Sequence, residues 1–455
     1  MKNNDTIIAI STPYGRGGIG IVRVSGNSSL SIIKKIFIPV KGWDDLKPRE
    51  IFTGFIIDPE KHIKIHKALV TYFKAPRSYT GEDVVEISCF SSPPILNYVL
   101  LLGIKSGARL AEPGEFTQRA FLNGKIDLLQ AEAINDLIMS NTLKQALVSF
   151  TQSEGFLSKK IEAIKKKLID IISSVEASIE FPDENLEINW DLYGLWIKQL
   201  IEDISKMLET FEYGKLLKEG FSLSITGKPN VGKSTLFNSL LKEERAIVTQ
   251  FPGTTRDYIR ETILINDIPC SLIDTAGIEK SNNAIDIESI KKGEEIIKKS
   301  DGILLIFDLS KRVSKKDYEI IDKVKNKNMI IVFNKMDLPR KLETEKIIKI
   351  LDGRPSVEIS AKLRANLNQL ENLINNFFVS EIKESEFILN LRQKQVLEEV
   401  LKFLEKGFDF FENGYREEII IEELKGAMNS LGKLTGEIKV EEIINNIFQN
   451  FCVGK

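Results

Sequence analysis

The stretch FSLSITGKPNVGKSTLFNSLL, residues 221–241, decides how the central part of this chain folds. Its first six residues alternate apolar and small polar side chains as a short strand does, and the residues after Ser234 have the apolar spacing of a helix. Between them lies the pattern Gly-x-x-x-x-Gly-Lys-Ser, from Gly227 to Ser234. A glycine-rich loop between a strand and a helix lets backbone N–H groups surround phosphate oxygens. We therefore predict a phosphate-binding loop here.

Two side chains of this loop have the chemistry that a nucleoside triphosphate requires. Lys233 supplies a cation for the β- and γ-phosphates, and the hydroxyl of Ser234 suits Mg²⁺. The helix that follows directs the positive end of its dipole at the bound anion. Around this loop, residues 218–378 alternate strand and helix patterns, which predicts a parallel sheet covered by helices.

Two later segments indicate guanine rather than adenine as the base. IIVFNKMDLP, residues 330–339, is an apolar strand that ends in Asn334-Lys335-Met336-Asp337. A carboxylate there accepts hydrogen bonds from the ring N–H and the exocyclic amino group of guanine, whereas adenine would leave it unpaired. Ser360-Ala361-Lys362 follows another short strand, where a backbone N–H can donate to the guanine carbonyl. The order and spacing of these segments predict GTP binding.

Two segments between these motifs have the character of nucleotide switches. CSLIDTAG places Asp274 after an apolar strand, where its carboxylate can reach Mg²⁺ through water, and Gly277 where its N–H can meet the γ-phosphate. In GTTRD, one hydroxyl of Thr254 or Thr255 would complete the Mg²⁺ shell only while the γ-phosphate is present. We expect an order–disorder transition there to follow hydrolysis.

The residue after DTAG is Ile278, at a position where many GTPases have a water-orienting glutamine. An isoleucine cannot orient water, so hydrolysis requires another polarising group. Asn230 offers a side-chain amide oxygen that suits a monovalent cation, and such a cation would act where an arginine finger acts elsewhere. The alternative is that Asn230 is an ordinary loop asparagine.

The composition and the periodicity of apolar residues divide the chain of 455 residues into four parts. Residues 1–117 contain short β-branched runs and one helical stretch, which predicts an α+β domain. Residues 118–217 and 379–455 have helical periodicity, and the α/β segment 218–378 lies between them. We expect one helical domain into which a Ras-like P-loop domain is inserted. Two separate helical domains are the alternative.

The composition also excludes several classes of protein. Lys and Arg (63) nearly balance Asp and Glu (65) for a net charge of −2, so contact with nucleic acid requires a local patch or a partner. No apolar run reaches the roughly 18 residues that a membrane span needs. Three cysteines predict no disulfide framework and favour a reducing, cytoplasmic location.

Two further features have plain structural interpretations. His62 and His66, the two histidines, lie in a stretch with strand-like alternation, which argues against histidine catalysis or a histidine-rich metal site. The glycines from Gly15 to Gly20 formally match a dinucleotide-binding fingerprint. That fingerprint needs a helix after the glycines, whereas the residues that follow have the composition of a strand, so we reject it.

Motifs along the whole chain resemble those of the MnmE (TrmE) family of tRNA-modifying GTPases, which belongs to the TrmE-Era-EngA-like P-loop GTPases. Besides the nucleotide motifs, the resemblance rests on DTIIAISTPYGRGGIGIVRVSG (5–26), SYTGEDVVEIS (78–88), RLAEPGEFTQRAFLNGKIDLLQAEAINDLI (109–138), FPGTTRD (251–257) and FCVGK (451–455). The resemblance implies that the N-terminal domain dimerises and binds a reduced folate, 5,10-methylenetetrahydrofolate or its analogue 5-formyltetrahydrofolate, as a one-carbon donor.

The resemblance also implies an activity and its partners. GTP would be hydrolysed when two G domains meet in the presence of Mg²⁺ and K⁺. With the FAD-dependent partner MnmG (GidA), in a heterotetramer or larger assembly, the homodimer would add an aminomethyl or carboxymethylaminomethyl group to C5 of the wobble uridine in certain tRNAs. A membrane has no part in this activity.

By position, the resemblance assigns residues to each ligand. Mg²⁺ would be held by Ser234 and Thr255, K⁺ by Asn230, Thr249, Phe251 and Thr254, and folate by Arg23, Glu82, Lys125 and Lys455. The residues expected at GTP are Asn230, Val231, Gly232, Lys233, Ser234, Thr235, Thr249, Gln250, Phe251, Pro252, Gly253, Thr254, Thr255, Asp274, Thr275, Ala276, Gly277, Asn334, Lys335, Asp337, Ser360, Ala361 and Lys362.

The chain departs from the family pattern at three places, and two catalytic assignments stay open. Phe90-Ser91-Ser92 replaces a His-Gly-Gly stretch, so the local turn differs, and Glu279 replaces an arginine. The water-orienting acid is Asp286 by ungapped counting, one methylene shorter than the family's glutamate, with Glu288 as the alternative. Cys452 is either a catalytic thiol or an ordinary tail cysteine.

Two other functions are alternatives to tRNA modification. A ribosome-assembly GTPase would need an RNA-binding module, such as a basic KH-like segment, which the sequence does not show. A folate enzyme with a vestigial G domain is disfavoured by the intact nucleotide motifs.

Overall fold

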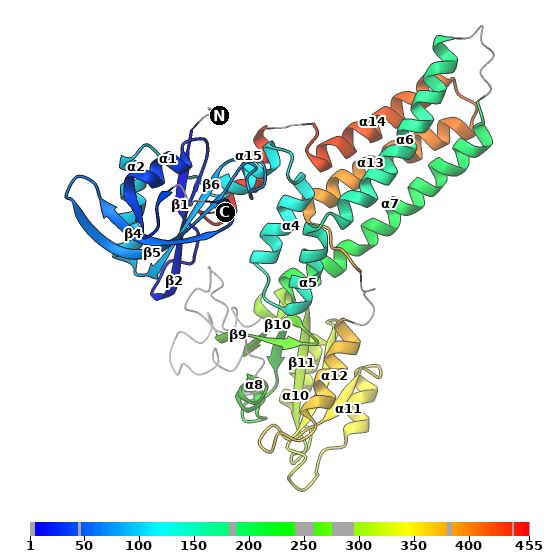
Figure 1. The fold of residues 1–455 in the computed structure, drawn as a ribbon. Helices are drawn as coiled ribbons and strands as arrows, with labels where there is room; N and C mark the ends of the chain where they lie inside the picture. The colour runs from blue at the N-terminus through cyan, green and yellow to red at the C-terminus, as the bar shows by residue number, and fades with distance from the viewer. Residues whose placement is uncertain are drawn as a thin grey trace. The chain divides into compact units, whose positions relative to one another are not determined.

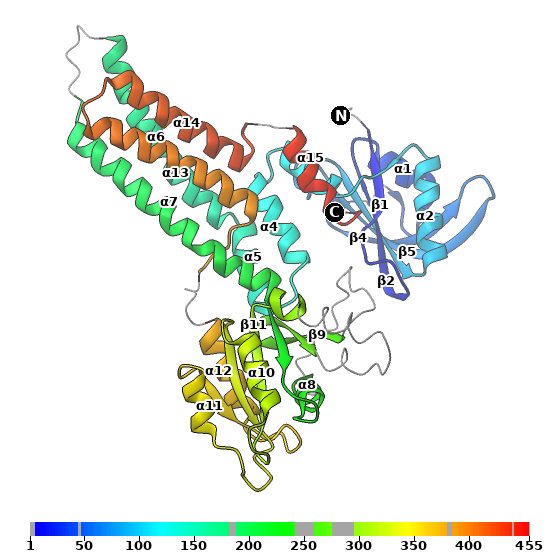
Figure 2. The same ribbon diagram turned by 180° about the vertical axis from the view of Figure 1, so that it is seen from behind.

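The computed structural model describes residues 5–43, 47–181, 188–241, 259–274, 295–379, 385–438 and 441–454. They belong to two compact units, which Figures 1 and 2 show as ribbons from opposite sides. The first unit comprises Met1–Asn135, Gln152–Ile201 and Val396–Lys455, and the second comprises Asp136–Thr151 and Glu202–Gln395.

A seven-stranded sheet forms the N-terminal part of the first unit. Its strands lie in the order β3-β4-β5-β6-β2-β1-β7, and every neighbouring pair is antiparallel except β1 and β7. The strands are β1 Ile7–Ile10, β2 Gly17–Ser25, β3 Phe37–Pro39, β4 Ile51–Asp58, β5 Ile63–Phe73, β6 Val84–Ser91 and β7 Arg109–Leu110. The predicted α+β texture is confirmed, although the short strands β3 and β7 were not predicted.

Helices α1 (Ser29–Ile36) and α2 (Pro93–Lys105) cover one face of this sheet. They pack on the alternate residues of the strands, such as Val24 and Ile87, which are fully buried. Helix α2 begins at Pro93, because the fixed backbone angle of proline suits the first helical turn, where its missing N–H costs nothing.

Two predictions from the sequence concern this sheet, one for the glycines from Gly15 to Gly20 and one for the two histidines. Strand β2 begins at Gly17, inside the glycine run, so the rejection of a dinucleotide-binding loop is confirmed. His66 lies in β5, and its Nε2 accepts a hydrogen bond from the backbone N–H of Phe90. The strand prediction is wrong for His62, which has a φ of +52° in the turn before β5. Alternation in the sequence continues through this turn and therefore does not mark where the strand begins.

The remaining helices confirm the predicted helical texture on both sides of the P-loop segment. They are α3 Glu115–Leu122, α4 Leu128–Ile138, α5 Leu143–Ser153, α6 Phe156–Glu180, α7 Trp190–Glu219, α13 Leu391–Glu412, α14 Glu417–Thr435 and α15 Glu441–Gln449. Within the first unit, α6 packs against α14. The start of α7 meets the end of α13, where the rings of Trp190 and Phe411 stack 5.7 Å apart.

A six-stranded sheet forms the centre of the second unit. Its order is β13-β12-β11-β8-β10-β9, and β9 alone among these described strands runs antiparallel to its neighbour. The elements are β8 Phe221–Thr226, α8 Lys233–Leu241, β9 Ile259–Ile265, β10 Ile268–Asp274, β11 Gly302–Asp308, α10 Lys315–Val324, β12 Met329–Asn334, α11 Thr344–Ile350, β13 Ser356–Glu358 and α12 Leu367–Phe378. The predicted parallel α/β sheet is confirmed.

Strands β10, β11 and β12 are buried along their whole length. Two hydrophobic clusters, one on each face of the sheet, bury alternate residues of these strands, which explains their continuous apolar sequences. In such a sheet, ligands bind beyond the carboxyl ends of the strands, where the loops with polar residues gather.

The division into domains stays a prediction. The second unit groups residues 136–151 and 202–219, expected in the helical domain, with the parallel sheet. In the described part of the chain, no helix is both long enough and apolar enough to cross a lipid bilayer.

Candidate functional site

The phosphate-binding loop joins β8 to α8, as the sequence predicts. Gly227 has a φ of +155°, and a Cβ there would lie 2.5 Å from the carbonyl oxygen of Ile306. Gly232 has a φ of +103°, and a Cβ there would lie 2.3 Å from Nδ2 of Asn334. Both positions therefore require glycine, because the loop passes close to β11 and β12 in a conformation that other residues rarely adopt.

The two reactive side chains of the loop lie at its centre. Lys233 is only 4% exposed, and its ammonium donates hydrogen bonds to the carbonyl oxygens of Gly227 at 2.5 Å and of Lys228 at 3.3 Å. The Ser234 hydroxyl donates to Oδ2 of Asp274 at 2.8 Å. A cation thus lies inside the loop, and the two predicted groups of the Mg²⁺ site lie together. A hydroxyl and a carboxylate are hard oxygen donors, which fit Mg²⁺.

The Asn334 side chain forms hydrogen bonds to the phosphate loop and to both of the predicted base-binding loops. Its Nδ2 donates to the carbonyl oxygen of Val231 at 2.9 Å, and its Oδ1 accepts from the backbone N–H groups of Ala361 at 3.0 Å and Lys335 at 2.8 Å. The side chain is 2% exposed, so these bonds form in a dry environment where leaving one unmade would be costly. Asn334 therefore holds the phosphate loop and the two predicted base-binding loops in one geometry.

The carboxylate of Asp337 is oriented but open to solvent. Its Oδ1 accepts a hydrogen bond from the Ser360 hydroxyl at 2.6 Å, and the residue is exposed. Ser360 and Ala361 are buried beside it, whereas Lys362 is exposed. The structure thus brings Asp337 next to the Ser360–Lys362 loop, as recognition of guanine by both would require.

Asp308 is a site residue that the sequence analysis missed. Its Oδ2 lies 2.7 Å from Nζ of Lys335, which also donates to the carbonyl oxygen of Asn230 at 2.7 Å. Burial raises the pKa of Asp308, but hydrogen bonds from Lys335 and Ser310 outweigh it, so the pKa lies below its ordinary value. Asp308 ends the buried strand LLIFD beside β8, and that position was the signal that could have revealed it.

Many of the predicted site residues lie outside the described residues. They are Thr249, Gln250, Phe251, Pro252, Gly253, Thr254, Thr255, Thr275, Ala276, Gly277, Asp286, Glu288 and Lys455. Ile278 and Glu279 lie outside them as well.

A second group of predicted residues gathers on the N-terminal sheet. The Arg23 guanidinium lies 5.5 Å from the ring centre of Tyr79 and 5.6 Å from that of Phe116. Its Nε donates to Glu86 at 2.9 Å. These contacts hold the cation in a partly buried position between two aromatic rings.

Glu82 lies on the same side of β2. Its carboxylate accepts hydrogen bonds from Ser25 at 2.7 Å and from Arg119 at 3.1 and 3.2 Å. Ser25 is two residues from Arg23, so the two side chains leave the strand on one face. Arg119 also binds Asp5 and belongs to a wider set of charges that the sequence analysis did not identify.

Lys125 flanks the loop that carries Glu82. Its ammonium donates to the carbonyl oxygen of Pro76 at 3.2 Å, and Asn123 donates to that of Thr80 at 2.7 Å. The structure therefore brings Arg23, Glu82 and Lys125, which are more than 40 residues apart in the sequence, around residues 76–82.

The C-terminal tail lies on this same part of the molecule. Val453 pairs with Pro113, and the carbonyl oxygen of Gly454 accepts hydrogen bonds from Ser11 at 3.0 Å and from Arg23 at 3.4 Å. Gly454 has a φ of +96°, and a Cβ there would lie 2.3 Å from the carbonyl oxygen of Ile10. Glycine is therefore needed for the tail to pack this closely.

Two other predicted features also lie in this unit. Cys452 is exposed, next to the tail residues that touch the sheet. The altered segment Phe90–Ser92 continues as strand β6 up to Ser91, whose hydroxyl donates to the carbonyl oxygen of Gly15 at 3.0 Å. The Phe90 ring lies 5.0 Å from that of His66.

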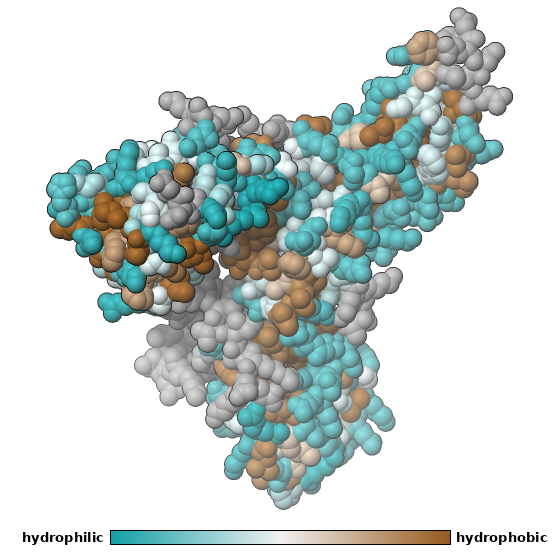
Figure 3. All heavy atoms as spheres, viewed as in Figure 1, coloured by the Kyte–Doolittle hydropathy of each residue, from teal (hydrophilic) through white to brown (hydrophobic). Residues whose placement is uncertain are grey.

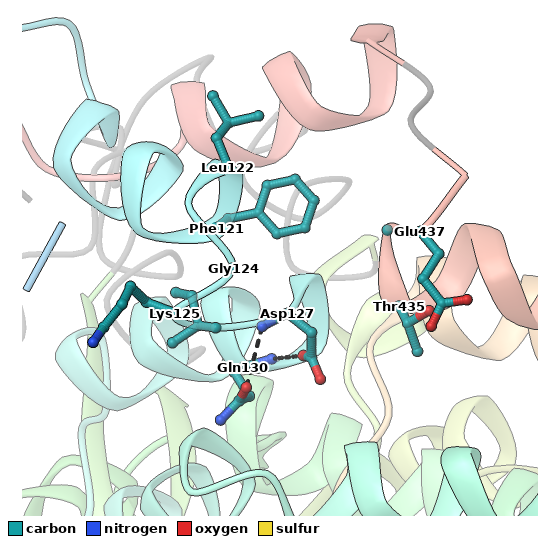
Figure 4. A pocket seen from close by; sticks show the side chains of 10 residues that line it. Phe121, Leu122, Gly124, Lys125, Asp127, Gln130, Thr435 and Glu437 are labelled. Carbon is teal, nitrogen blue, oxygen red and sulfur yellow. Dashed lines mark hydrogen bonds between the residues drawn. The ribbon is translucent and has the colours of Figure 1, made fainter. Parts of the chain in front are cut away.

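A pocket of about 490 Å³ lies beside Lys125, between the α3–α4 loop and the end of α14 (Figure 4). Burial raises the pKa of Asp127. Its carboxylate accepts a hydrogen bond from the backbone N–H of Gln130, and the side-chain oxygen of Gln130 accepts one from the backbone N–H of Asp127. This reciprocal pair caps α4. Figure 4 shows the Lys125 ammonium directed away from Asp127 and Glu437.

Comparison with known proteins places the whole chain in one family. Residues 6–125 match the family described as "GTP-binding protein TrmE N-terminus", and residues 128–452 match the "MnmE helical domain". Proteins named tRNA modification GTPase MnmE are 42% identical in Thermoanaerobacter pseudethanolicus, 41% in Alkaliphilus metalliredigens and 38% in Acetivibrio thermocellus, each over 99% or more of both chains.

The chain belongs to the MnmE family. It is therefore a GTP-binding GTP hydrolase that acts in tRNA modification, with tRNA as the implied substrate. The solved structures that it resembles include Era of Aquifex aeolicus bound to GDP and aluminium fluoride, with 28% identity, a TM-score of 0.29, and 40% of this chain and 66% of that chain covered. The G domain of the Thermotoga maritima FeoB iron transporter is 21% identical, with a TM-score of 0.27 over 34% of this chain and 98% of that chain.

Proposed function

We propose that this MnmE-family chain is a K⁺-activated GTPase whose G domains pair during hydrolysis. Together with the FAD-dependent partner MnmG, it adds a carboxymethylaminomethyl or aminomethyl group to C5 of the wobble uridine, with a reduced folate as the one-carbon donor. The observation that carries the proposal is the assembled nucleotide site, where Lys233, Ser234 with Asp274, and Asp337 with Ser360 lie around one edge of the sheet.

Each residue proposed for that site has a part in hydrolysis, although Thr255, Asp286 and Glu288 lie outside the described residues. Lys233 neutralises the phosphate oxygens, and Ser234 with Thr255 holds the Mg²⁺ that stabilises the charge developing on them. Asp337 selects guanine, and Asp286 or Glu288 orients the attacking water. Asp274 would reach the Mg²⁺ through water, and its hydrogen bond from Ser234 keeps the two groups together.

K⁺ would supply positive charge where an arginine finger acts in other GTPases, and Ile278 stands at the position of a water-orienting glutamine. Asn230 is exposed and has a φ of +65°, and its carbonyl oxygen is held by Lys335. Its side chain is therefore free to turn outward as a K⁺ ligand, together with Thr249, Phe251 and Thr254.

Folate binding is supported by the charges around residues 76–82. Arg23, Lys125 and Lys455 pair with the glutamate carboxylates of the folate, and Glu82 accepts from the donors of its pterin ring. The docked tail carries Gly454 to Arg23, and Lys455 follows Gly454 in the sequence. The bound folate supplies the one-carbon unit.

Homodimerisation is supported by an apolar face of the N-terminal sheet. Ile38, Ile51, Leu69 and Phe90 are exposed on the face opposite α1 and α2, with Phe90 63% and Ile51 68% exposed. Figure 3 shows apolar side chains gathered on the part of the surface that carries β4 and β5. Contiguous exposed apolar residues mark interaction surfaces, and a second copy of this sheet would cover them.

Two experiments test the proposal. Deletion of the gene should remove the C5 modification from tRNA nucleosides analysed by mass spectrometry, and an unchanged modification would reject the assignment. The purified protein should hydrolyse GTP faster in K⁺ than in Na⁺, and equal rates would reject the role of the cation.

Comparison of Asp286→Ala with Glu288→Ala in K⁺ identifies the acid, since the variant that loses turnover lacks the water-orienting carboxylate.

A further inference from the structure

A second lysine of the phosphate loop, Lys228, pairs with the start of helix α10. The Nζ atom of Lys228 lies 2.5 Å from Oδ2 of Asp317 and 2.9 Å from the Ser314 hydroxyl. Both side chains of the ion pair are largely buried, at 17% and 5% exposure. An ion pair shielded from water is screened little by salt and fixes the position of both partners.

Asp317 is held in place by its own helix before it meets the lysine. It lies in the first turn of α10, and its Oδ2 accepts hydrogen bonds from the backbone N–H of Ser314 at 2.7 Å and from the Ser314 hydroxyl at 2.9 Å. This capping box satisfies N–H groups that the helix itself cannot pair. The carboxylate is therefore a rigid anchor, and the Lys228 side chain adjusts to it.

A second acidic residue of the same chain segment holds the loop two residues further on. Asp308 at the end of β11 binds Lys335, whose ammonium donates to the carbonyl oxygen of Asn230. The segment from Asp308 to Asp317 thus contacts Lys228 of the loop directly and Asn230 through Lys335. Asn230 has a φ of +65°, in the left-handed region that asparagine adopts more readily than most residues other than glycine.

We propose that Asp317 is a positioning residue that acts through Lys228 to hold the Asn230 backbone in the conformation that presents its side-chain oxygen to K⁺. This inference rests on the proposed K⁺ activation. Lys228 pairs with residues at the start of α10, so we expect the ion pair to affect the cation site more than the affinity for guanine nucleotides.

Three variants of the full-length protein test the inference: Lys228→Met, Asp317→Asn and the two combined. Each should raise the K⁺ concentration for half-maximal GTP turnover by about tenfold, because a small displacement of a liganding group is costly. The combined variant should show the same shift as either single one, since all three remove one ion pair. GDP affinity, measured by calorimetry, should change less than about twofold.

Matched variants separate positioning from general stability. Lys228→Met leaves the Asp317 capping box intact, so α10 keeps its start even if Asp317→Asn weakens it. Lys228→Arg keeps a cation within reach of Asp317 and should retain the wild-type K⁺ requirement. Asp322→Asn removes an exposed ion pair with Lys325 on the same helix and should also leave that requirement unchanged.

The outcomes distinguish this inference from the proposal on which it rests. If the wild type is activated by K⁺ and the variants have its K⁺ requirement, the positioning role is rejected and K⁺ activation stands. If the variants lose GDP affinity in parallel with K⁺ response, the pair supports the whole loop and the inference is overturned. Equal wild-type rates in K⁺ and Na⁺ reject K⁺ activation, and the inference with it.

Discussion

The nucleotide site and the residues around Arg23 are built in opposite ways. In the nucleotide site, each working group comes from a short contiguous motif at the end of a parallel strand, and the sheet order β12-β11-β8-β10 brings the motifs to one edge. Around Arg23, the contacts join Asp5, Glu82, Arg119 and Gly454, which come from the two ends and the middle of the first unit. No single motif contains that second site.

This difference explains why the nucleotide site can be recognised from local sequence motifs, whereas the residues around Arg23 cannot. A phosphate loop works through its own backbone, so local glycines and one lysine specify most of it. The second site works through side chains that meet only when the C-terminal tail lies on the N-terminal sheet. A change in one site should therefore leave the other intact, and each prediction below tests that independence.

The largest effect is expected from Lys233→Ala. Loss of the buried ammonium removes the cation that balances the phosphate charge, so GTP turnover should fall by at least about 100-fold. Binding of 5-formyltetrahydrofolate, followed by fluorescence titration of the same preparation, should be unchanged. A parallel loss of folate binding would show that the two sites depend on each other.

The next effect is expected from Asp308→Ala. The variant leaves Lys335 of the guanine motif without its carboxylate, so GDP affinity should fall by about 10- to 100-fold, as for loss of a largely buried charge partner. Calorimetric titration with GDP measures it. Glu343→Ala removes a fully exposed ion pair with Lys346 in the same unit and should have wild-type affinity. Equal affinities of both variants would contradict the structural role of Asp308.

A smaller effect in the other site is expected from Gly454→Ala. The added Cβ would clash with the carbonyl oxygen of Ile10 and would require an unfavourable φ of +96°. The tail should detach, and folate affinity should fall by about tenfold, as for the loss of one charge-assisted contact. Gly42→Ala meets no atom within 4 Å and serves as the control. Normal folate affinity in Gly454→Ala would show that the tail is not part of that site.

The smallest effect is a dependence of stability on pH. Burial raises the pKa of Glu115, but hydrogen bonds from Arg109, the Glu112 N–H and Arg119 outweigh it, so the pKa lies below the ordinary 4.5. A lowered folded-state pKa contributes stability that is complete above about pH 4.5 and is lost as pH falls through the folded value. Calorimetric melting between pH 6 and 3.5 should show a steeper loss for the wild type than for Glu115→Gln. Identical slopes would contradict the pairing.

The outcome of the sequence analysis follows the same division. The strand and helix patterns of the P-loop segment and the phosphate loop itself were predicted because their signals are local, whereas the short strands β3 and β7 were not. Asp308 and Asp317 were not identified as site residues, because an aspartate after a strand or in a first helical turn has the same local sequence whether it caps a helix or pairs with a distant lysine. His62 was assigned to a strand because alternation in the sequence does not stop where the chain turns.

The amino-acid sequence by itself determined the P-loop class of fold, the guanine motif and the family. Those properties depend on short local motifs and on the order in which the motifs follow one another along the chain. Only the tertiary structure decided that Lys228 faces Asp317, that Asn334 joins three loops, and that Gly454 meets Arg23. Such contacts depend on which elements become neighbours in space, and burial makes them specific because an unpaired charge or hydrogen-bonding group is costly away from water.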